Sequence, residues 1–253
     1  CACAGLGEQE VTGHYDLLVA RIDSIKSAAV LPPDEGYEGP RQPEWLDPND
    51  YFKVLGHLRM EEGYVLDYLF WCYGDCAPMI YAREAGTIPV KSREELFRLS
   101  DEWNETYETT SDNWLFADNI WMSRVFVDGT DESFIEYAIL HMIGEQFYLG
   151  WHFCYNDSRP IFSYEALVNY VLDKEKKEFM KVDDLRKAVR KIRGHDFSPA
   201  VTRSDGYAIV KMNFFSMWGG LTEGRFFVTL QPPHTIERCD STEIFEYNCG
   251  IRF

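Results

Sequence analysis

The sequence predicts an α+β protein in which one mixed or mainly antiparallel sheet packs against helices. Two groups of strand-like runs, a hairpin near 63–82 and a C-terminal meander over 200–253, are rich in β-branched and aromatic residues. Between them apolar residues recur at helical spacing, and the longest helix is expected at about 131–154. With 253 residues, 45% of them hydrophobic, the chain can bury a core without a metal or a disulfide. This grouping of strands and helices favours the α+β class.

The N-terminal elements follow from periodicity and proline content. Residues 15–25 carry apolar side chains at helical spacing and predict an amphipathic helix. Five prolines within residues 32–48 exclude a helix there, disfavour strand pairing and indicate a strap or linker. Asp47 followed by Pro48 has the pattern of a helix cap with proline at the first helical position. A short helix is therefore expected around 49–55.

The predicted hairpin has a cysteine at each side of its turn. Residues 63–71 and 77–82 are strand-like, and the turn between them is bracketed by Cys72 and Cys76. A disulfide between these two cysteines would clamp the end of the hairpin. The alternative is that both are free, buried thiols.

The remaining cysteines leave several pairings open. Cys239 and Cys249 lie on successive predicted strands and could pair across them, whereas Cys154 in the apolar helix is most simply a small buried hydrophobic residue. The partner of Cys3 is open. A zinc site would need a second cysteine pair at ligand spacing, and the sequence has none.

Capping signals mark the remaining helices. Ser92 and Glu95 form a capping box, Thr130 is placed to cap the longest helix, and Ser163 begins a helix that runs through Leu172. The stretch between the first two of these helices is aromatic but has no clear period.

After residue 200 the pattern changes to strands separated by glycine-containing turns at 205–206 and 219–220, which predicts four or five antiparallel strands. We expect residues 1–14 to be an N-terminal tether and residues 15–253 to form a single α+β domain. A boundary near residue 195 is the alternative, but it would leave a small C-terminal piece.

The charge of the chain limits its partners. The 42 acidic and 25 basic residues give a net charge of −17. Such a field repels phosphate backbones and anionic lipid headgroups, so nucleic acid is not an expected partner. The most apolar run, residues 134–155, contains Glu136, Glu145 and two histidines, which disfavours a membrane span.

The sequence begins Cys1-Ala2-Cys3-Ala4-Gly5, without an initiating methionine. This start resembles the processed N-terminus of bacterial lipoproteins, and the resemblance covers these five residues. It implies that Cys1 carries a lipid and that the protein is extracytoplasmic, held at the membrane only through that lipid. Lipidation of Cys1 would also account for the odd number of cysteines, seven. Trimming of the chain by another route is the alternative.

One group of residues has the chemistry of a catalytic or metal site. His141, Glu145 and His152 share one face of the long predicted helix, with Tyr148 on the same stripe. Histidine and glutamate are zinc or iron ligands, and a glutamate beside a bound water can act as a general base. However, His141 and His152 would lie about 16 Å apart along the helix axis, so one ion could not bind both unaided. The alternative is that these groups form hydrogen bonds inside the core.

Residues 181–193 predict a basic amphipathic helix that ends at Gly194. Its apolar stripe faces one way, and five lysines and arginines face the other. In an acidic protein this face could dock an anionic partner or membrane; the alternative is a solvated face that forms ion pairs within the protein.

Together these features favour an extracytoplasmic, lipid-anchored bacterial binding or interaction module for a protein or small-molecule ligand, with no cofactor. The alternative is a hydrolase, with or without a metal ion, that has its site near the helix face of His141, Glu145 and His152.

Overall fold

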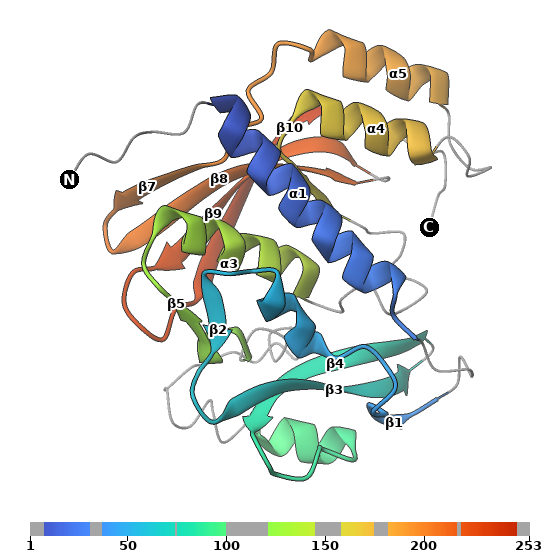
Figure 1. Cartoon of the computed structure of the whole chain (residues 1–253), viewed down its shortest axis with the longest axis vertical. Coiled ribbons are helices and arrows are strands. Elements are labelled where there is room, and N and C mark those ends of the chain that lie inside the picture. Colours follow the sequence, from blue (N-terminus) through green and yellow to red (C-terminus); the bar gives the residue numbers. More distant parts are fainter. Residues whose placement is uncertain are drawn as a thin grey trace.

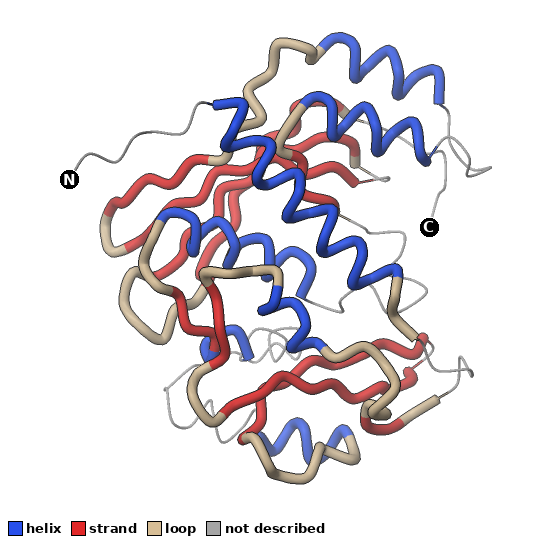
Figure 2. The backbone as a smooth tube through the Cα atoms, in the orientation of Figure 1, coloured by secondary structure: helices blue, strands red, loops and turns tan. Residues whose placement is uncertain are grey.

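The computed structural model of the chain describes residues 8–30, 37–73, 75–99, 121–144, 158–174, 182–216 and 219–246. Helices and antiparallel sheets make up this part of the chain, which confirms the predicted α+β class (Figures 1 and 2). The predicted lipid site at Cys1 lies outside the described residues and stays a prediction.

Helix α1 (Glu8–Ser27) begins seven residues before the predicted helix 15–25. Two glutamates in its first turn favour a start at this point, because negative side chains interact well with the amino end of a helix. The predicted apolar face is confirmed: Leu18, Val19 and Ile22 are buried in the main core.

The proline-rich strap forms one short strand. Strand β1 (Gly39–Pro40) pairs with Phe70 and Leu69, and residues 31–36 are not described. The predicted cap at its end is confirmed, because the Asp47 carboxylate accepts a hydrogen bond from the Asn49 amide at 3.0 Å. The segment that follows, η1 (Pro48–Lys53), is a 3-10 helix rather than an α-helix.

Strands β3 (Tyr64–Tyr73) and β4 (Asp75–Glu84) form the predicted hairpin and pair along their whole length. With β1 they make a three-stranded sheet, in the order β1-β3-β4. Residues 93–99, beyond the hairpin, are helical as the capping box predicts, and the Glu95 amide donates to Ser92 Oγ at 3.3 Å. A separate two-stranded ribbon pairs β2 (Leu58–Met60) with β5 (Val125–Val127).

The predicted meander is also confirmed. Strands β7 (Ala200–Ser204), β8 (Tyr207–Ser216), β9 (Gly220–Thr229) and β10 (Ile236–Phe245) are antiparallel neighbours in sequence order. The first turn needs positive φ angles, which Asp205 and Gly206 supply at 51° and 85°. Strand β6 (Arg159–Ile161) completes the sheet by pairing with the far end of β8, on the edge that β7 also uses.

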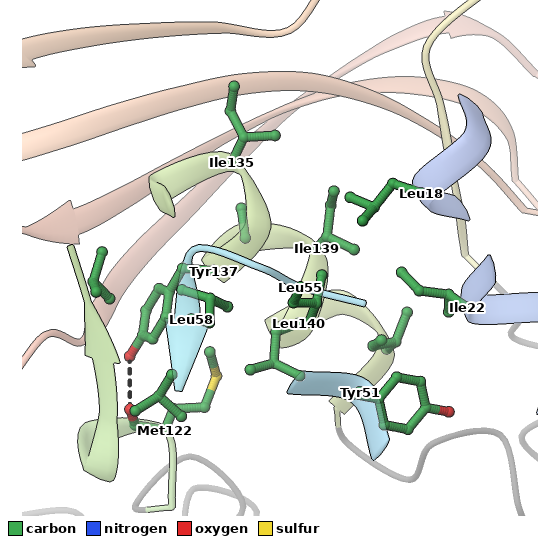
Figure 3. Packing of buried hydrophobic residues seen from close by; sticks show 14 of the residues in the cluster. Leu18, Ile22, Tyr51, Leu55, Leu58, Met122, Ile135, Tyr137, Ile139 and Leu140 are labelled. Carbon is green, nitrogen blue, oxygen red and sulfur yellow. Dashed lines mark hydrogen bonds between the residues drawn. The ribbon is translucent and has the colours of Figure 1, made fainter. Parts of the chain in front are cut away.

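The expectation of one sheet is wrong, because the hairpin and the meander lie in separate sheets. Helix α3 (Asp131–Gly144) lies between them, and both sheets bury one face in the same core cluster (Figure 1). Figure 3 shows how this core is assembled: side chains of α3 meet those of α1 and of the segments around η1 and the ribbon. The residues labelled there are Leu18, Ile22, Tyr51, Leu55, Leu58, Met122, Ile135, Tyr137, Ile139 and Leu140.

Helix α3 corresponds to the helix that the sequence predicts at about 131–154, and the structure describes it as far as Gly144. Thr130 caps it as expected, accepting from the Ser133 amide at 3.1 Å. Its buried side chains cover nearly every side, which confirms a central position. Residues 145–157, including the expected end of the helix, lie outside the described residues. No helix in the described ranges is long and apolar enough to cross a membrane.

Helices α4 (Tyr164–Lys174) and α5 (Val182–Lys191) pack together at one end of the molecule (Figure 1). Ser163 caps α4 as predicted, since its Oγ accepts from the Ala166 amide at 2.9 Å. The second core cluster lies beneath both helices and includes Leu167, Val171, Leu185 and Val189. Gly194 does not adopt the left-handed conformation expected of a helix-ending glycine; turn hydrogen bonds follow Lys191 instead.

Candidate functional site

His141, the described member of the predicted histidine–glutamate stripe, faces the interior. Its ring lies edge-on to Phe226 of β9, with centroids 6.1 Å apart, and its Nδ1 is buried without a hydrogen-bond partner among the described residues. Burial lowers the pKa of His141 to about 4, so the ring is neutral at pH 7. Glu145 and His152 lie outside the described residues, and their relation to His141 stays a prediction.

No group of three histidine, cysteine, aspartate or glutamate side chains within the described ranges could hold a metal ion. His141 has an aromatic neighbour rather than a second ligand in this part of the chain. The described surroundings of His141 are therefore those of a core histidine.

A different histidine is held by carboxylates at the start of α3. His57 precedes β2 and Asp128 follows β5, so the pair extends the register in which Leu58 lies opposite Val127. The Nδ1 of His57 is 2.9 Å from Asp128 Oδ2. The other Asp128 oxygen accepts from the Thr130 amide at 2.9 Å. One aspartate thus orients the imidazole and stabilises the turn that leads into α3.

Glu136 fixes the backbone beneath this imidazole. It is 2% exposed, and its Oε2 accepts from the His57 amide at 2.8 Å. Burial raises the pKa of Glu136, and the backbone hydrogen bonds from Gly56 and His57 oppose that shift. The His57 backbone and its ring are thus each held by a different carboxylate of the same helical region.

The electrostatics give His57 acid–base character. The hydrogen bond to Asp128 raises the pKa of His57, and partial burial opposes this effect. Burial also opposes the shift at Asp128, but hydrogen bonds from Thr130, His57 and Ser133 hold its pKa well below the ordinary value. The His57 side chain is 40% exposed, and an aspartate on Nδ1 leaves Nε2 as the proton-exchanging atom. Sequence reasoning missed this pair because its members lie 71 residues apart and belong to no local motif.

Helix α5 confirms the predicted basic amphipathic helix. Leu185 and Val189 are buried against α4, and Ile192 packs beside them. Five lysines and arginines on the opposite side are exposed: Arg186, Lys187, Arg190, Lys191 and Arg193. We call these five side chains the α5 basic face.

The α5 basic face belongs to a local concentration of positive charge. Nine of the 25 lysines and arginines lie between residues 174 and 193, together with four carboxylates. This segment therefore carries +5, and the remainder of the chain carries −22. The helix itself lies at the end of the molecule furthest from the β3–β4 hairpin (Figure 1). Such asymmetry is typical of a surface that attracts an anionic partner.

The predicted disulfide can be followed only through the backbone. Cys72 and Cys76 are direct Cα partners in the β3–β4 pairing. Opposed residues of an antiparallel pair have Cβ atoms about 4.5–5.5 Å apart, close to the separation that a disulfide needs. Their side chains lie outside the described ones, and the bridge stays a prediction. Cys239 is exposed; Cys3, Cys154 and Cys249 are not described.

Comparisons of the chain with protein-family models, with curated proteins and with solved structures find no match.

Proposed function

We propose that the protein is a binding module that recognises an acidic segment of a partner protein through the α5 basic face. The observation that supports this proposal is the set of five exposed basic side chains on one side of a helix whose other side is packed against α4. A helix anchored in this way presents its charges from a fixed base, which reduces the entropy lost on binding.

The spacing of these side chains suits carboxylates. Arg186, Arg190 and Arg193 follow one another at helical spacing, and Lys187 and Lys191 form a second row beside them. Arginine binds a carboxylate through two parallel hydrogen bonds, so a row of arginines matches successive acidic side chains on a helix or strand. The negative charge of the rest of the chain would orient an acidic partner toward this end during approach.

A protein partner fits this face better than a bilayer. Helices that lie in a membrane surface insert their apolar side among the lipids, and the apolar side of α5 is already used in the second core cluster. The charge of −22 on the rest of the chain would also repel an anionic membrane.

The test compares the wild-type protein with the double variant Arg190→Glu/Lys191→Glu. The probe is a fluorescent peptide of twelve glutamates, read by anisotropy at low salt. We expect saturable binding to the wild-type protein. The affinity should fall about tenfold or more in the variant, because two charge-assisted contacts become repulsive. The matched control, Lys53→Glu/Lys91→Glu, changes the net charge equally at exposed positions outside α5 and should bind like wild type.

Equal loss of binding in both double variants would show that only net charge matters and would contradict a site on α5. A protein that binds phosphatidylglycerol vesicles but gives no anisotropy change with the peptide would have a membrane, and not a protein, as its partner.

A hydrolase is the second candidate, and the observation that favours it is His57 rather than the predicted stripe. An exposed imidazole held through Nδ1 by an aspartate is the acid–base unit of many hydrolytic sites. Hydrolysis of p-nitrophenyl acetate tests it: the rate should rise as His57 loses its proton and should fall in His57→Gln but not in His14→Gln. A rate that is the same in all three proteins would dismiss His57 as a catalytic residue.

A further inference from the structure

Two arginines converge on one buried aspartate in the sheet at the opposite end of the molecule from α5. Asp67 lies on the central strand β3 and is 1% exposed. Its Oδ1 accepts from Arg41 Nε at 3.1 Å, and its Oδ2 accepts from Arg83 Nε at 2.9 Å. Arg83 comes from β4, and Arg41 follows β1, so the two flanking strands each supply one guanidinium.

Both oxygens of the carboxylate accept hydrogen bonds, whereas the guanidinium groups keep donors that Asp67 does not use. The Tyr68 amide also donates to Asp67 Oδ1, at 3.0 Å. One of the terminal nitrogens of Arg83 donates to the Thr87 carbonyl at 2.9 Å. Within the described residues, the other terminal nitrogen of Arg83 and both terminal nitrogens of Arg41 have no partner, and none of the three is a buried unsatisfied atom. Each of the three therefore reaches solvent in part, although the two side chains are only 17% (Arg41) and 16% (Arg83) exposed.

The charges of the cluster do not balance. Two guanidinium groups surround one carboxylate, so the cluster carries +1 at its surface in a protein whose net charge is −17. A single arginine would be enough to neutralise Asp67. The contacts through Nε hold both guanidinium groups in place and leave the end of Arg41, with its two parallel N–H donors, unused by Asp67.

We propose that Arg41 and Arg83 form a binding site for a small oxyanion, a carboxylate or phosphoryl group carried by a ligand. The two end nitrogens of Arg41 would bind it through parallel hydrogen bonds, and the remaining nitrogen of Arg83 would add a third. Asp67 is a positioning residue, because it orients both arginines without contacting the ligand. The site is separate from α5 and does not depend on the function proposed for that helix.

The test titrates the full chain with inorganic phosphate and, separately, with acetate, at constant ionic strength. Binding is followed through the backbone amide and arginine Nε–Hε resonances in ¹H–¹⁵N NMR spectra. We expect saturable shifts at Arg41, Arg83 and the neighbouring strand β3 with at least one of the two anions. Saturation by phosphate alone would indicate a phosphoryl ligand, and saturation by acetate a carboxylate ligand.

Two variants separate recognition from bulk charge. Arg41→Gln should weaken anion binding about tenfold or more, since two charge-assisted hydrogen bonds are lost. Arg203→Gln makes the same change in net charge, but Arg203 lies outside the proposed site and forms an ion pair with Asp131. This variant should bind like wild type. Arg41→Lys keeps a charge beside Asp67 but lacks the two parallel donors, so it should fold and still bind weakly.

The proposal is overturned if neither anion gives saturable shifts in the wild-type protein. It is equally overturned if a folded Arg41→Lys variant binds as tightly as wild type, because the parallel donors would then play no part. A loss of binding in Arg203→Gln as large as in Arg41→Gln would reduce the effect to general electrostatics and also reject the site.

Discussion

At the scale of single residues, His141 illustrates how burial decides the role of a titratable group. Its position on α3 was predicted, but its buried Nδ1 has no partner among the described residues, and its ring packs edge-on against Phe226. A neutral polar atom in this position opposes folding, because it loses its water without a replacement.

His141→Leu should therefore stabilise the protein. At pH 7 we expect a gain of about 1 kcal/mol, because the unpaired atom is removed while most of the volume remains. The gain should grow as the pH falls from 6.5 to about 4, since the unfolded chain binds a proton at His141 in this window and the folded protein does not. Urea unfolding at pH 7 and pH 5 measures both effects, with His14→Leu on the exposed side of α1 as the control. A variant less stable than wild type at both pH values would mean that Nδ1 has a partner in the folded protein.

A glycine at the end of α3 gives a second prediction at this scale. A Cβ added to Gly144 would lie 2.6 Å from the ring of Trp121, which is itself buried. Overpacking of this kind costs about 1–3 kcal/mol, more than the roughly 1 kcal/mol that alanine gains over glycine in a helix. Gly144→Ala should thus lower the free energy of unfolding.

Gly13→Ala is the matched control, because its added Cβ meets nothing within 4 Å in the middle of α1. It should raise the free energy of unfolding by about 0.5–1 kcal/mol in the same urea experiment. If both substitutions stabilise the protein, the close approach of α3 to Trp121 is incorrect.

At the scale of elements, local signals predicted much of the fold. The caps at Asp47, Thr130 and Ser163 are confirmed because a cap depends on a side chain and an amide two or three residues away. The separation of the two sheets could not be predicted in this way. It depends on which face of each sheet packs against α3 in the core, and the pattern of residues along single strands does not predict how two sheets are placed around a helix.

The β3–β4 hairpin yields the prediction that belongs to this scale. Because Cys72 and Cys76 are opposed in the register, oxidised protein should contain a disulfide between them. The bridge closes a very small loop and should add only about 1–2 kcal/mol to stability. Peptide mass spectrometry without reduction should find the linked pair, and Cys72→Ser/Cys76→Ser should lose stability only under oxidising conditions. Two alkylated, unlinked cysteines in oxidised protein would contradict this pairing.

At the scale of the whole molecule, the polar clusters that define the candidate sites join distant parts of the chain. His57 meets Asp128 from 71 residues away, and Arg41 meets Asp67 from 26 residues away. With 42 acidic residues in the sequence, a carboxylate partner cannot be selected until the fold is known. The α5 basic face is different, because its residues are local, and the sequence predicted it directly.

Net charge acts on the molecule as a whole, and two effects of salt oppose each other. Screening weakens exposed ion pairs such as Arg203–Asp131, but each is worth only about 0–1 kcal/mol. Screening also weakens the mutual repulsion of a chain at −17, and that repulsion extends over the whole surface when the Debye length is about 30 Å, at 0.01 M salt.

We expect the second effect to dominate, so the free energy of unfolding should rise by about 1 kcal/mol between 0.01 and 0.15 M sodium chloride in urea titrations. Lys53→Glu/Lys91→Glu, at a net charge of about −21, should show a steeper rise, because the repulsion being screened is larger. Arg190→Glu/Lys191→Glu reaches the same net charge but breaks up the positive segment, and its slope should match that of the first variant if repulsion acts globally. A free energy of unfolding that falls with added salt would show instead that ion pairs, and not net charge, control the stability of this protein.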